Sequence, residues 1–354
     1  MEERLHLKGL NGLRAIAAIS VVIAHIHLNG FMYNDRWPRW LGTYSVTIFF
    51  TLSGFLITYL LLTEKEKTTI SIRKFYMRRI LRIWPLYFAY LLIAIILIYI
   101  QTPEKLPGLL PCYLFFAANV PNILSTSLPY LGHYWSLGVE EQFYLFWPWL
   151  IKRPGNTFKV MMTFLCIFFT GRLIARFLYI TYGYFIPINA FNHTRFDCMA
   201  VGGIGAYLCF TGNKFFRKVA VNKFTEVLCW LCFCLVFTNK YNISPFFNHD
   251  IISLMTLGLI MNLSFANRPV INLENRFFDL LGRISYGIYV IHPLVLIGLG
   301  KMLSQLHISR AWESFDFFFG ALLITTGIAW LSHEFFEKRF LRLKDRFSVI
   351  KSSG

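Results

Sequence analysis

Charged residues are scarce in this chain of 354 residues. They make up 15% of the sequence, against about 25% in soluble domains, and hydrophobic residues make up 56%. So little polar side chain cannot cover so much apolar chain in water. This excludes a soluble enzyme, a disulfide scaffold and a disordered chain, and it predicts an all-α polytopic membrane protein.

A metal site is also lacking in the pattern of cysteines. All seven lie in or beside apolar stretches, and only Cys229 and Cys232 have Cys-x-x-Cys spacing. No second pair and no histidine cluster completes a zinc site. We therefore expect the cysteines to be buried apolar side chains. We expect no metal and no permanently bound cofactor.

Apolar runs of membrane-spanning length recur along the whole chain, where a crossing needs about 20 apolar residues. The first run is preceded by basic residues as in a signal peptide, but Ile23-Ala24-His25-Ile26 is a poor cleavage site. We expect about ten transmembrane helices, the first one retained. Their predicted ranges are 10–28, 41–62, 83–100, 136–151, 158–180, 197–212, 224–238, 250–266, 283–300 and 316–333.

Acidic residues are half as numerous as basic ones, and the net charge is +17. With ten crossings and a cytoplasmic N-terminus, the inner segments hold 24 Lys and Arg residues and the outer segments 7. This asymmetry predicts that both termini are cytoplasmic, and it points to no nucleic-acid partner. A shorter run at 109–118, broken by prolines, predicts a re-entrant or interfacial segment. We expect a single integral-membrane domain over 1–354, with its core at 9–340 and no separate soluble domain.

Charges within a bilayer are costly and often mark function. The first span contains Arg14 and His25. Eleven positions at 100° each bring them within about 20° of one helix face, about 16 Å apart along the axis. A snorkelling arginine and a structurally satisfied histidine are the alternative for either residue alone.

The fourth span begins with His133 and Tyr134 and carries Glu140, Glu141 and Gln142 near its outer end. A helix cap explains one acid, because acids favour the helix N-terminus, but not all three polar residues. A histidine with a carboxylate partner is the usual general-base arrangement. Because adjacent side chains diverge by about 100°, we expect only one of the two acids to serve His25.

Further polar residues open or interrupt later spans. Arg195 and Asp197 open the sixth, where a structural ion pair is the simpler interpretation. His292 precedes Pro293 in the ninth. Since proline leaves a carbonyl of the preceding turn without its helical donor, His292 has a structural explanation beside a direct role.

The segment from Arg73 to Arg82, called the basic stretch below, holds four arginines and a lysine. As a helix it would place Arg78, Arg79 and Arg82 on one cationic ridge. Two interpretations stay open at this point. The ridge contacts anionic lipid, or its guanidinium forks hold a phosphate-bearing ligand.

Six motifs in order resemble those of the membrane-bound acyltransferase 3 family, which includes O-antigen and exopolysaccharide O-acetyltransferases. Each is weak alone, and together they cover residues 9 to about 340. They are Arg14 with His25 ten intervening residues later, Phe49-Phe50-Thr51-Leu52-Ser53-Gly54-Phe55, Arg78-Arg79-Ile80-Leu81-Arg82-Ile83-Trp84-Pro85, Trp135-Ser136-Leu137-Gly138-Val139-Glu140-Glu141-Gln142-Phe143-Tyr144, Thr194-Arg195-Phe196-Asp197 and Ser285-Tyr286-Gly287-Ile288-Tyr289-Val290-Ile291-His292-Pro293. The family's Glu-x-Pro ending is incomplete, since Arg339 follows Glu337-Lys338, so no role is carried to Glu337.

The resemblance implies O-acyl transfer in the bacterial plasma (inner) membrane, commonly of acetyl from acetyl-CoA to a carbohydrate hydroxyl. O-antigen or lipopolysaccharide sugars, exopolysaccharide and other glycans are all allowed acceptors, and longer acyl donors stay open. Acyl-CoA would bind on the cytoplasmic side and the carbohydrate on the outer side, with lipids around the helices. The expected catalytic residues are His25, Glu140 and Glu141, and the expected donor-binding residues are Arg14, Arg78, Arg79 and Arg82. Ser53, Tyr134, Arg195, Asp197 and His292 are further candidates.

Two alternatives remain open at this stage. Direct transfer with His25 as general base and a transient acyl-histidine use the same residues. A proton-coupled transporter of a small solute would also carry buried Arg, His and Glu, although the inverted repeats typical of transporters are not visible.

Overall fold

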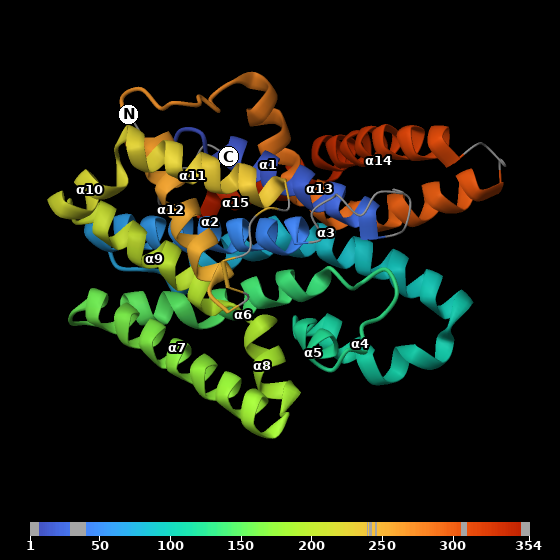
Figure 1. Cartoon of the computed structure of the whole chain (residues 1–354), viewed down its shortest axis with the longest axis horizontal. Helices are drawn as coiled ribbons and strands as arrows, with labels where there is room; N and C mark the ends of the chain where they lie inside the picture. The colour runs from blue at the N-terminus through green and yellow to red at the C-terminus, as the bar shows by residue number, and fades with distance from the viewer. Residues whose placement is uncertain are drawn as a thin grey trace. The chain divides into compact units, whose positions relative to one another are not determined.

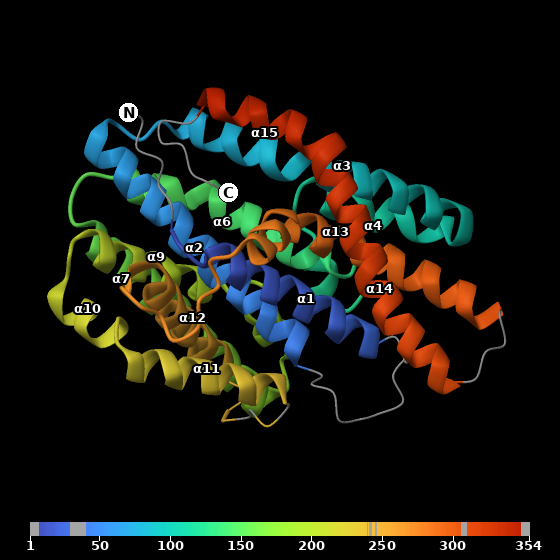
Figure 2. The ribbon, with the colours of Figure 1, turned by 90° about the horizontal axis from the view of Figure 1, so that it is seen from above.

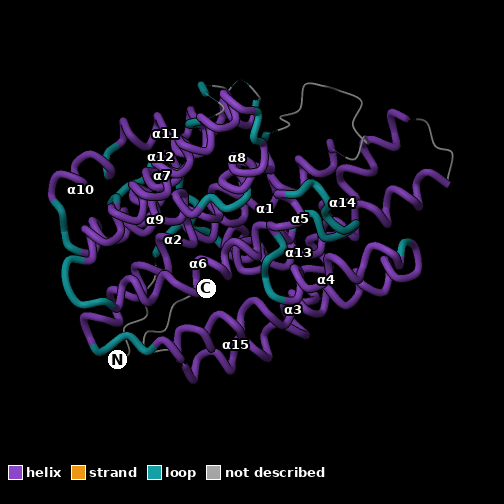
Figure 3. Tube along the Cα trace, turned by 90° about the horizontal axis from the view of Figure 1, so that it is seen from below, coloured by secondary structure: helices purple, strands orange, loops and turns teal. Residues whose placement is uncertain are grey.

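Apolar runs bounded by polar turns fold as helices throughout the part of the chain that the structure describes. The structure is a computed structural model, and it describes residues 7–28, 40–238, 240, 243–244, 246–305 and 310–347. Every regular element within these ranges is helical, as the tube in Figure 3 shows. The all-α expectation is therefore confirmed for the described residues.

Contacts along the chain divide it into two units, and each is described by itself. Unit 1 comprises residues up to Phe49 and from Asn213 to Arg346, and unit 2 comprises Phe50–Gly212 and the short segment from Phe347. The helix α2, Leu41–Lys67, begins in unit 1 and continues into unit 2.

Unit 1 is built around the first helix and the last long ones. Apolar side chains of α1, α13 and α14 form one buried cluster that includes Ala18, Ile288 and Phe317. Figures 1 and 2 show α13 and α14 side by side. Besides the start of α2, the helices of unit 1 are α1 (Leu10–Leu28), α10 (Lys214–Ala220), α11 (Lys223–Phe237), α12 (Asn248–Phe265), α13 (Arg276–Gln305), α14 (Arg310–Ser332), a π-helical turn at His333–Glu337 and α15 (Lys338–Lys344), followed by a 3₁₀ turn at Asp345–Phe347 that reaches the unit boundary.

Unit 2 holds the helices from the middle of the chain. They are the rest of α2, α3 (Ile72–Gln101), a 3₁₀ turn at Pro103–Lys105, α4 (Leu106–Leu114), α5 (Asn119–Ile123), α6 (Tyr134–Lys152), α7 (Thr157–Tyr182), α8 (Phe185–Asn192) and α9 (Phe196–Phe210). The backbones of α2 and α9 approach closely at two glycines. A Cβ added at Gly54 would lie 1.9 Å from the carbonyl oxygen of Met199, and one at Gly202 would lie 2.1 Å from that of Thr51. Gly54 in the Ser-Gly-Phe motif is therefore required by helix packing.

Each of the ten predicted spans falls on a helix. Five helical stretches are both long and apolar enough to cross a membrane, and a sixth results if α10 and α11, bent by 52°, count as one. The five are α2, α3, α7, residues Arg276–Met302 and residues Phe317–Phe347. The chain is thus a membrane protein with at least these candidate spans among its described residues.

The proline-broken run at 109–118 forms the end of α4 and the turn that follows it. α4 has nine residues, or about 14 Å at 1.5 Å per residue, which is far less than the hydrocarbon core of a bilayer at about 30 Å. Phe116 then takes a left-handed conformation with φ of 56°. The run therefore does not form a membrane-crossing helix.

Candidate functional site

His25 on α1 and His292 on α13, called the histidine pair below, meet inside unit 1. Their ring centroids are 4.9 Å apart with 58° between the planes. His292 has no exposed surface, and its apolar neighbours Ile288, Ile291 and Val295 belong to the α1–α13–α14 cluster. The fold therefore brings together two histidines that are separated by most of the sequence.

Backbone carbonyls fix the protonation of both rings. Nδ1 of His25 lies 2.9 Å from the carbonyl oxygen of Val21, and Nδ1 of His292 lies 2.7 Å from that of Tyr289. A carbonyl oxygen can only accept, so in each neutral ring Nδ1 carries the hydrogen and Nε2 carries the lone pair. Nε2 of His25 is therefore the atom that can take a proton.

The contact of His292 with Tyr289 has the cause expected from the sequence. Pro293 has no N–H to donate to the carbonyl four residues earlier, which belongs to Tyr289. Nδ1–H of His292 donates to that oxygen instead. The structural role of His292 is confirmed, and it uses only one of the two ring nitrogens.

Arg14 lies near the other end of α1, on a helix that is continuous through His25. Its Nη1 donates to Oδ1 of Asn11 at 3.4 Å, and Asn11 donates to Asp279 of α13 at 3.2 Å. Both polar positions on α1 are therefore linked to α13, Arg14 through a chain of two hydrogen bonds and His25 through the ring of His292.

Glu140 and Glu141, called the acid pair below, point to different helices of unit 2. Glu140 accepts hydrogen bonds from Ser53 of α2 at 3.0 Å and from the Tyr144 hydroxyl at 3.1 Å. Glu141 accepts one from the indole of Trp84 on α3 at 3.1 Å. The divergence expected for adjacent helical residues is therefore present, and α6 uses the two acids to contact α2 and α3.

Gln142, the third polar residue of this run, binds the segment between α4 and α5. Its amide donates to the carbonyl oxygen of Phe116 and to Oδ1 of Asn119, both at 2.8 Å. A Cβ at Gly138 would lie 2.7 Å from the same carbonyl oxygen. The left-handed turn at Phe116 is thus seated against α6 beside the acid pair, and helix capping does not account for Glu-Glu-Gln.

The basic stretch lies elsewhere than the sequence predicted. The predicted span began at 83, whereas α3 is one helix from Ile72, capped by Ser71, whose side chain accepts from the Lys74 amide. Its first turns pack along α6, because the Tyr76 hydroxyl donates to the Leu145 carbonyl and Trp84 reaches Glu141. The expectation that the ridge and the acids lie at opposite ends of the membrane was wrong.

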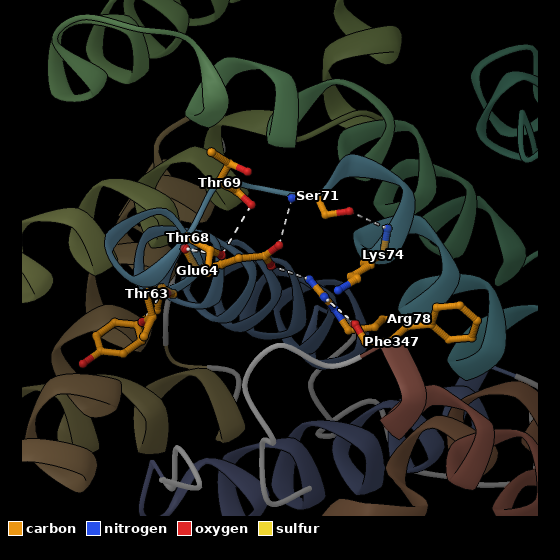
Figure 4. A network of polar contacts seen from close by, with 9 residues as sticks. Thr63, Glu64, Thr68, Thr69, Ser71, Lys74, Arg78 and Phe347 are labelled. Atoms are coloured by element: carbon orange, nitrogen blue, oxygen red, sulfur yellow. Dashed lines mark hydrogen bonds and ion pairs between the residues drawn. The ribbon is translucent and has the colours of Figure 1, made fainter. Parts of the chain in front are cut away.

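The three ridge arginines differ in their partners. Arg78 forms an ion pair with Glu64 at 3.0 Å and donates to the carbonyl oxygen of Phe347 at 2.9 Å (Figure 4). Glu64 also accepts from the Ser71 amide, so the pair ties α2, α3 and the segment at Phe347 together. Arg79 instead lies 5.5 Å from the centre of the Tyr144 ring, and both Arg79 and Arg82 interact electrostatically with Glu140.

The remaining candidates of unit 2 are held in structural contacts. The Tyr134 hydroxyl donates to the Tyr87 carbonyl at 2.9 Å. Asp197 forms a buried ion pair with Arg172 of α7 at 2.6 Å, so the carboxylate compensates an arginine within an apolar span. The sequence had left Arg172 without an assigned partner.

Arg195 caps α9 in a left-handed conformation, with φ of 43°, and its guanidinium lies 5.1 Å from the centre of the Trp135 ring. His193 packs edge-on against the same indole at 5.3 Å. Burial lowers the pKa of His193, so its ring is neutral near pH 7. One cluster therefore lies at the start of α6, formed by Trp135, His193 and Arg195.

Sequence reasoning missed Trp84 and Tyr144 as neighbours of the acids. Only Tyr144 carried a local signal, because it follows Glu140 by four residues and so lies on the same helix face. Since His25 belongs to unit 1 and the acid pair to unit 2, the pairing of His25 with a glutamate stays a prediction.

Comparison with known proteins decides the family. A model of the acyltransferase 3 family, described as an acyltransferase domain, matches residues 7–334. The chain belongs to this family. The histidine pair, the acid pair and the basic stretch therefore all lie within an acyltransferase domain.

Relatives of known name are O-acetyltransferases. Peptidoglycan O-acetyltransferase OatA of Listeria monocytogenes serovar 1/2a (strain EGD-e) is 29% identical over 334 residues, covering 83% of this chain and 50% of the relative. O-acetyltransferase OatA of Staphylococcus aureus (strain NCTC 8325) is 32% identical over 165 residues, covering 44% of this chain and 26% of the relative. The chain thus spans half or less of these relatives. No solved structure matches it.

Proposed function

We propose that this acyltransferase domain moves an acetyl group from acetyl-CoA to a hydroxyl of a bacterial cell-envelope carbohydrate. The observation that carries the proposal is the family match over residues 7–334. The relative from Listeria is named for peptidoglycan, so a peptidoglycan sugar is the first acceptor to test. The domain would lie in the bacterial plasma membrane with ten crossings and both termini cytoplasmic, as the distribution of basic residues indicates.

In the proposed reaction, Nε2 of His25 takes the proton of the acceptor hydroxyl while the hydroxyl oxygen attacks the thioester carbonyl. The carbon–sulfur bond breaks, and the CoA thiolate then receives that proton from the imidazolium. The lone pair that the Val21 contact leaves on Nε2 supports this role. The Val21 carbonyl accepts from Nδ1–H and so orients the ring of His25, a task for which a carboxylate had been expected.

For the donor, we propose that Arg79 and Arg82 attract the phosphates of CoA, while Arg78 holds the fold through Glu64. Phosphate recognition is a frequent use of arginine forks. Arg14, at the opposite end of α1 from His25, is the further donor contact that we propose.

The proposal is tested with the purified domain in detergent, acetyl-CoA and soluble peptidoglycan fragments. We expect CoA release that depends on the fragment, and a fragment heavier by one acetyl group in mass spectrometry. His25→Ala should remove both signals. Release of CoA with no acetylated product for any cell-envelope glycan would refute the proposed acceptor class, and no release at all would refute the donor.

A further inference from the structure

Most of the surface of helix α10 in unit 1 is uncovered. The helix has seven residues, and it is bent by 52° against α11 at the break that follows it (Figure 2). Of its side chains only Ala220 is buried, and Phe216 is half-buried. The segment from Thr211 to Thr225 contains no acidic residue. A short, basic and exposed helix thus adjoins the apolar helix α11.

Two pairs of apolar side chains on α10 have different surroundings. Residues four apart lie within about 40° of each other on a helix. Phe216 and Ala220 form the more buried pair, with Ala220 only 7% exposed. Phe215 and Val219 form the other pair, and they are 79% and 51% exposed. Exposed apolar side chains on one face of such a helix are typical of contact with lipid acyl chains.

The basic side chains of α10 share a third face. Lys214, Arg217 and Lys218 fall within about 100° around the helix axis, and all three are exposed. None of the three has an ion-pair partner in the part of the chain that the structure describes. The nearest acid along the sequence, Glu226, is 1% exposed and accepts from the Val270 amide instead. The positive charge of this face is therefore available to an anion from outside the chain.

Hydrogen bonds at the break fix the direction of α10. Asn222 caps the start of α11, and its side-chain amide donates to the carbonyls of Lys218 at 3.1 Å and Val219 at 2.7 Å. Asn262 of α12 donates to the Ala220 carbonyl at 2.6 Å. The last carbonyls of α10 are thus satisfied where the helix stops. The apolar and basic faces are therefore held in one orientation.

These faces match the boundary between lipid headgroups and acyl chains. Within the hydrocarbon core three basic residues on seven positions would be costly, which places α10 at the level of the headgroups. Helices that lie in this boundary turn an apolar face to the acyl chains and Lys or Arg to the headgroups. Phe224, Leu228 and Leu231 of α11 are also exposed, so the element that follows α10 has a lipid-facing surface of its own.

We propose that α10 is an interfacial anchor that binds the headgroups of anionic phospholipids through Lys214, Arg217 and Lys218. Phe215 and Val219 contact the acyl chains of the same lipids. Charge complementarity selects the ligand, because the basic face lacks a counter-ion from the chain and a phosphatidylglycerol headgroup carries a negative charge. The binding is non-covalent, and it does not depend on which group the domain transfers.

The test titrates the purified domain in neutral detergent with dioctanoyl phosphatidylglycerol, and with dioctanoyl phosphatidylcholine as the probe without net charge. Bound lipid is measured by native mass spectrometry. The triple variant Lys214→Gln, Arg217→Gln and Lys218→Gln should bind phosphatidylglycerol at least tenfold more weakly. The reason is that each basic residue near an anionic lipid contributes about 1 kcal/mol, or about fivefold in affinity. Binding of phosphatidylcholine should not change.

A matched triple variant separates a specific face from net charge. Lys152, Arg153 and Lys159 of unit 2 are also exposed, and their replacement by Gln removes the same charge. This control should bind phosphatidylglycerol within about twofold of the wild type. Equal loss in both triple variants would overturn the proposal, since any reduction of positive charge would then have the same effect.

Two further measurements complete the test. Phe215→Gln should weaken binding of phosphatidylglycerol severalfold and leave the melting temperature in lipid-free detergent unchanged, because the side chain is exposed. Unchanged lipid affinity of this variant would overturn the interfacial arrangement.

Initial rates with acetyl-CoA distinguish a lipid phosphate from a donor phosphate. The α10 triple variant should keep the wild-type KM for acetyl-CoA. If KM rises while binding of phosphatidylglycerol is unchanged, the basic face belongs to a donor site and the lipid anchor is refuted. Because the lipid titration needs no acyl transfer, failure of the proposed function would leave its result interpretable.

Discussion

The histidine pair of unit 1 is held by backbone carbonyls, whereas the acid pair of unit 2 is held by side-chain donors. Each imidazole keeps a lone pair at Nε2 after its carbonyl contact. The carboxylates instead accept hydrogen bonds from side chains: Glu140 from Ser53 and Tyr144, and Glu141 from Trp84. The carbonyl contacts thus orient two imidazoles in unit 1, whereas the carboxylates of unit 2 join α6 to α2 and α3.

The largest effect should come from removing the basic nitrogen itself. For His25→Ala we expect loss of transfer by about 10² to 10⁴, the usual contribution of a general base. Because the side chain makes its hydrogen bond to its own helix, membrane insertion should be unaffected. Acetylation of fragments is measured beside the melting temperature in detergent. Near-normal acetylation by the variant would remove His25 from the mechanism.

A large effect of a different kind is expected at the edge of the acid-pair region. Glu64 is 2% exposed and Arg78 13%, so Arg78→Ala leaves a buried carboxylate without its ion pair. Breaking such a pair costs about 3–5 kcal/mol in the free energy of unfolding.

Arg73→Ala, at an exposed position of the same helix, should change the free energy of unfolding by less than about 0.5 kcal/mol. Thermal unfolding of both variants in one detergent measures the difference. Equal stability would show that the contacts in Figure 4 contribute little to folding.

Within the acid pair, Glu140→Gln should be the more damaging change. The amide keeps the shape of the side chain but removes the charge that faces Arg79 and Arg82. We expect the free energy of unfolding to fall by about 1.5–3 kcal/mol, which is typical of hydrogen bonds to charged groups.

Glu141→Gln is the matched comparison. Among the described residues, Oε1 of Glu141 has no hydrogen-bond partner, and the Trp84 indole can still donate to the amide oxygen. Glu141→Gln should lower the free energy of unfolding by less than about 1 kcal/mol. Equal effects of the two variants on stability and transfer would remove the distinction between the acids.

The parts of this architecture that depend on local spacing could be predicted from the sequence. Apolar runs located the helices, and Pro293 identified the carbonyl that His292 satisfies, because both follow from the helical repeat. The face shared by Arg14 and His25 follows from the same repeat.

Contacts between distant helices could not be predicted in this way. Asp197 of α9 forms an ion pair with Arg172 of α7, and the helical repeat within one helix says nothing of contacts with another. The position of the basic stretch relative to the acid pair was misjudged because the predicted span was started at residue 83, after the last arginine. The cap at Ser71 shows that the helix begins eleven residues earlier, at Ile72, and a Ser before an apolar-periodic segment was a usable signal.

The smallest expected effect distinguishes the two uses of the ridge. Arg82 interacts electrostatically with Glu140. If it attracts CoA phosphates, Arg82→Ala should raise KM for acetyl-CoA by a few fold to about tenfold while KM for the glycan stays unchanged. Arg82→Lys should recover only part of this, because an ammonium lacks the guanidinium fork. The change should disappear with acetyl-pantetheine, a thioester without the phosphates. Initial rates for both donors in one neutral detergent measure it. A rise in KM that is equal for both donors would mean that Arg82 serves the acid pair, and the donor site would then have to be sought at Arg14.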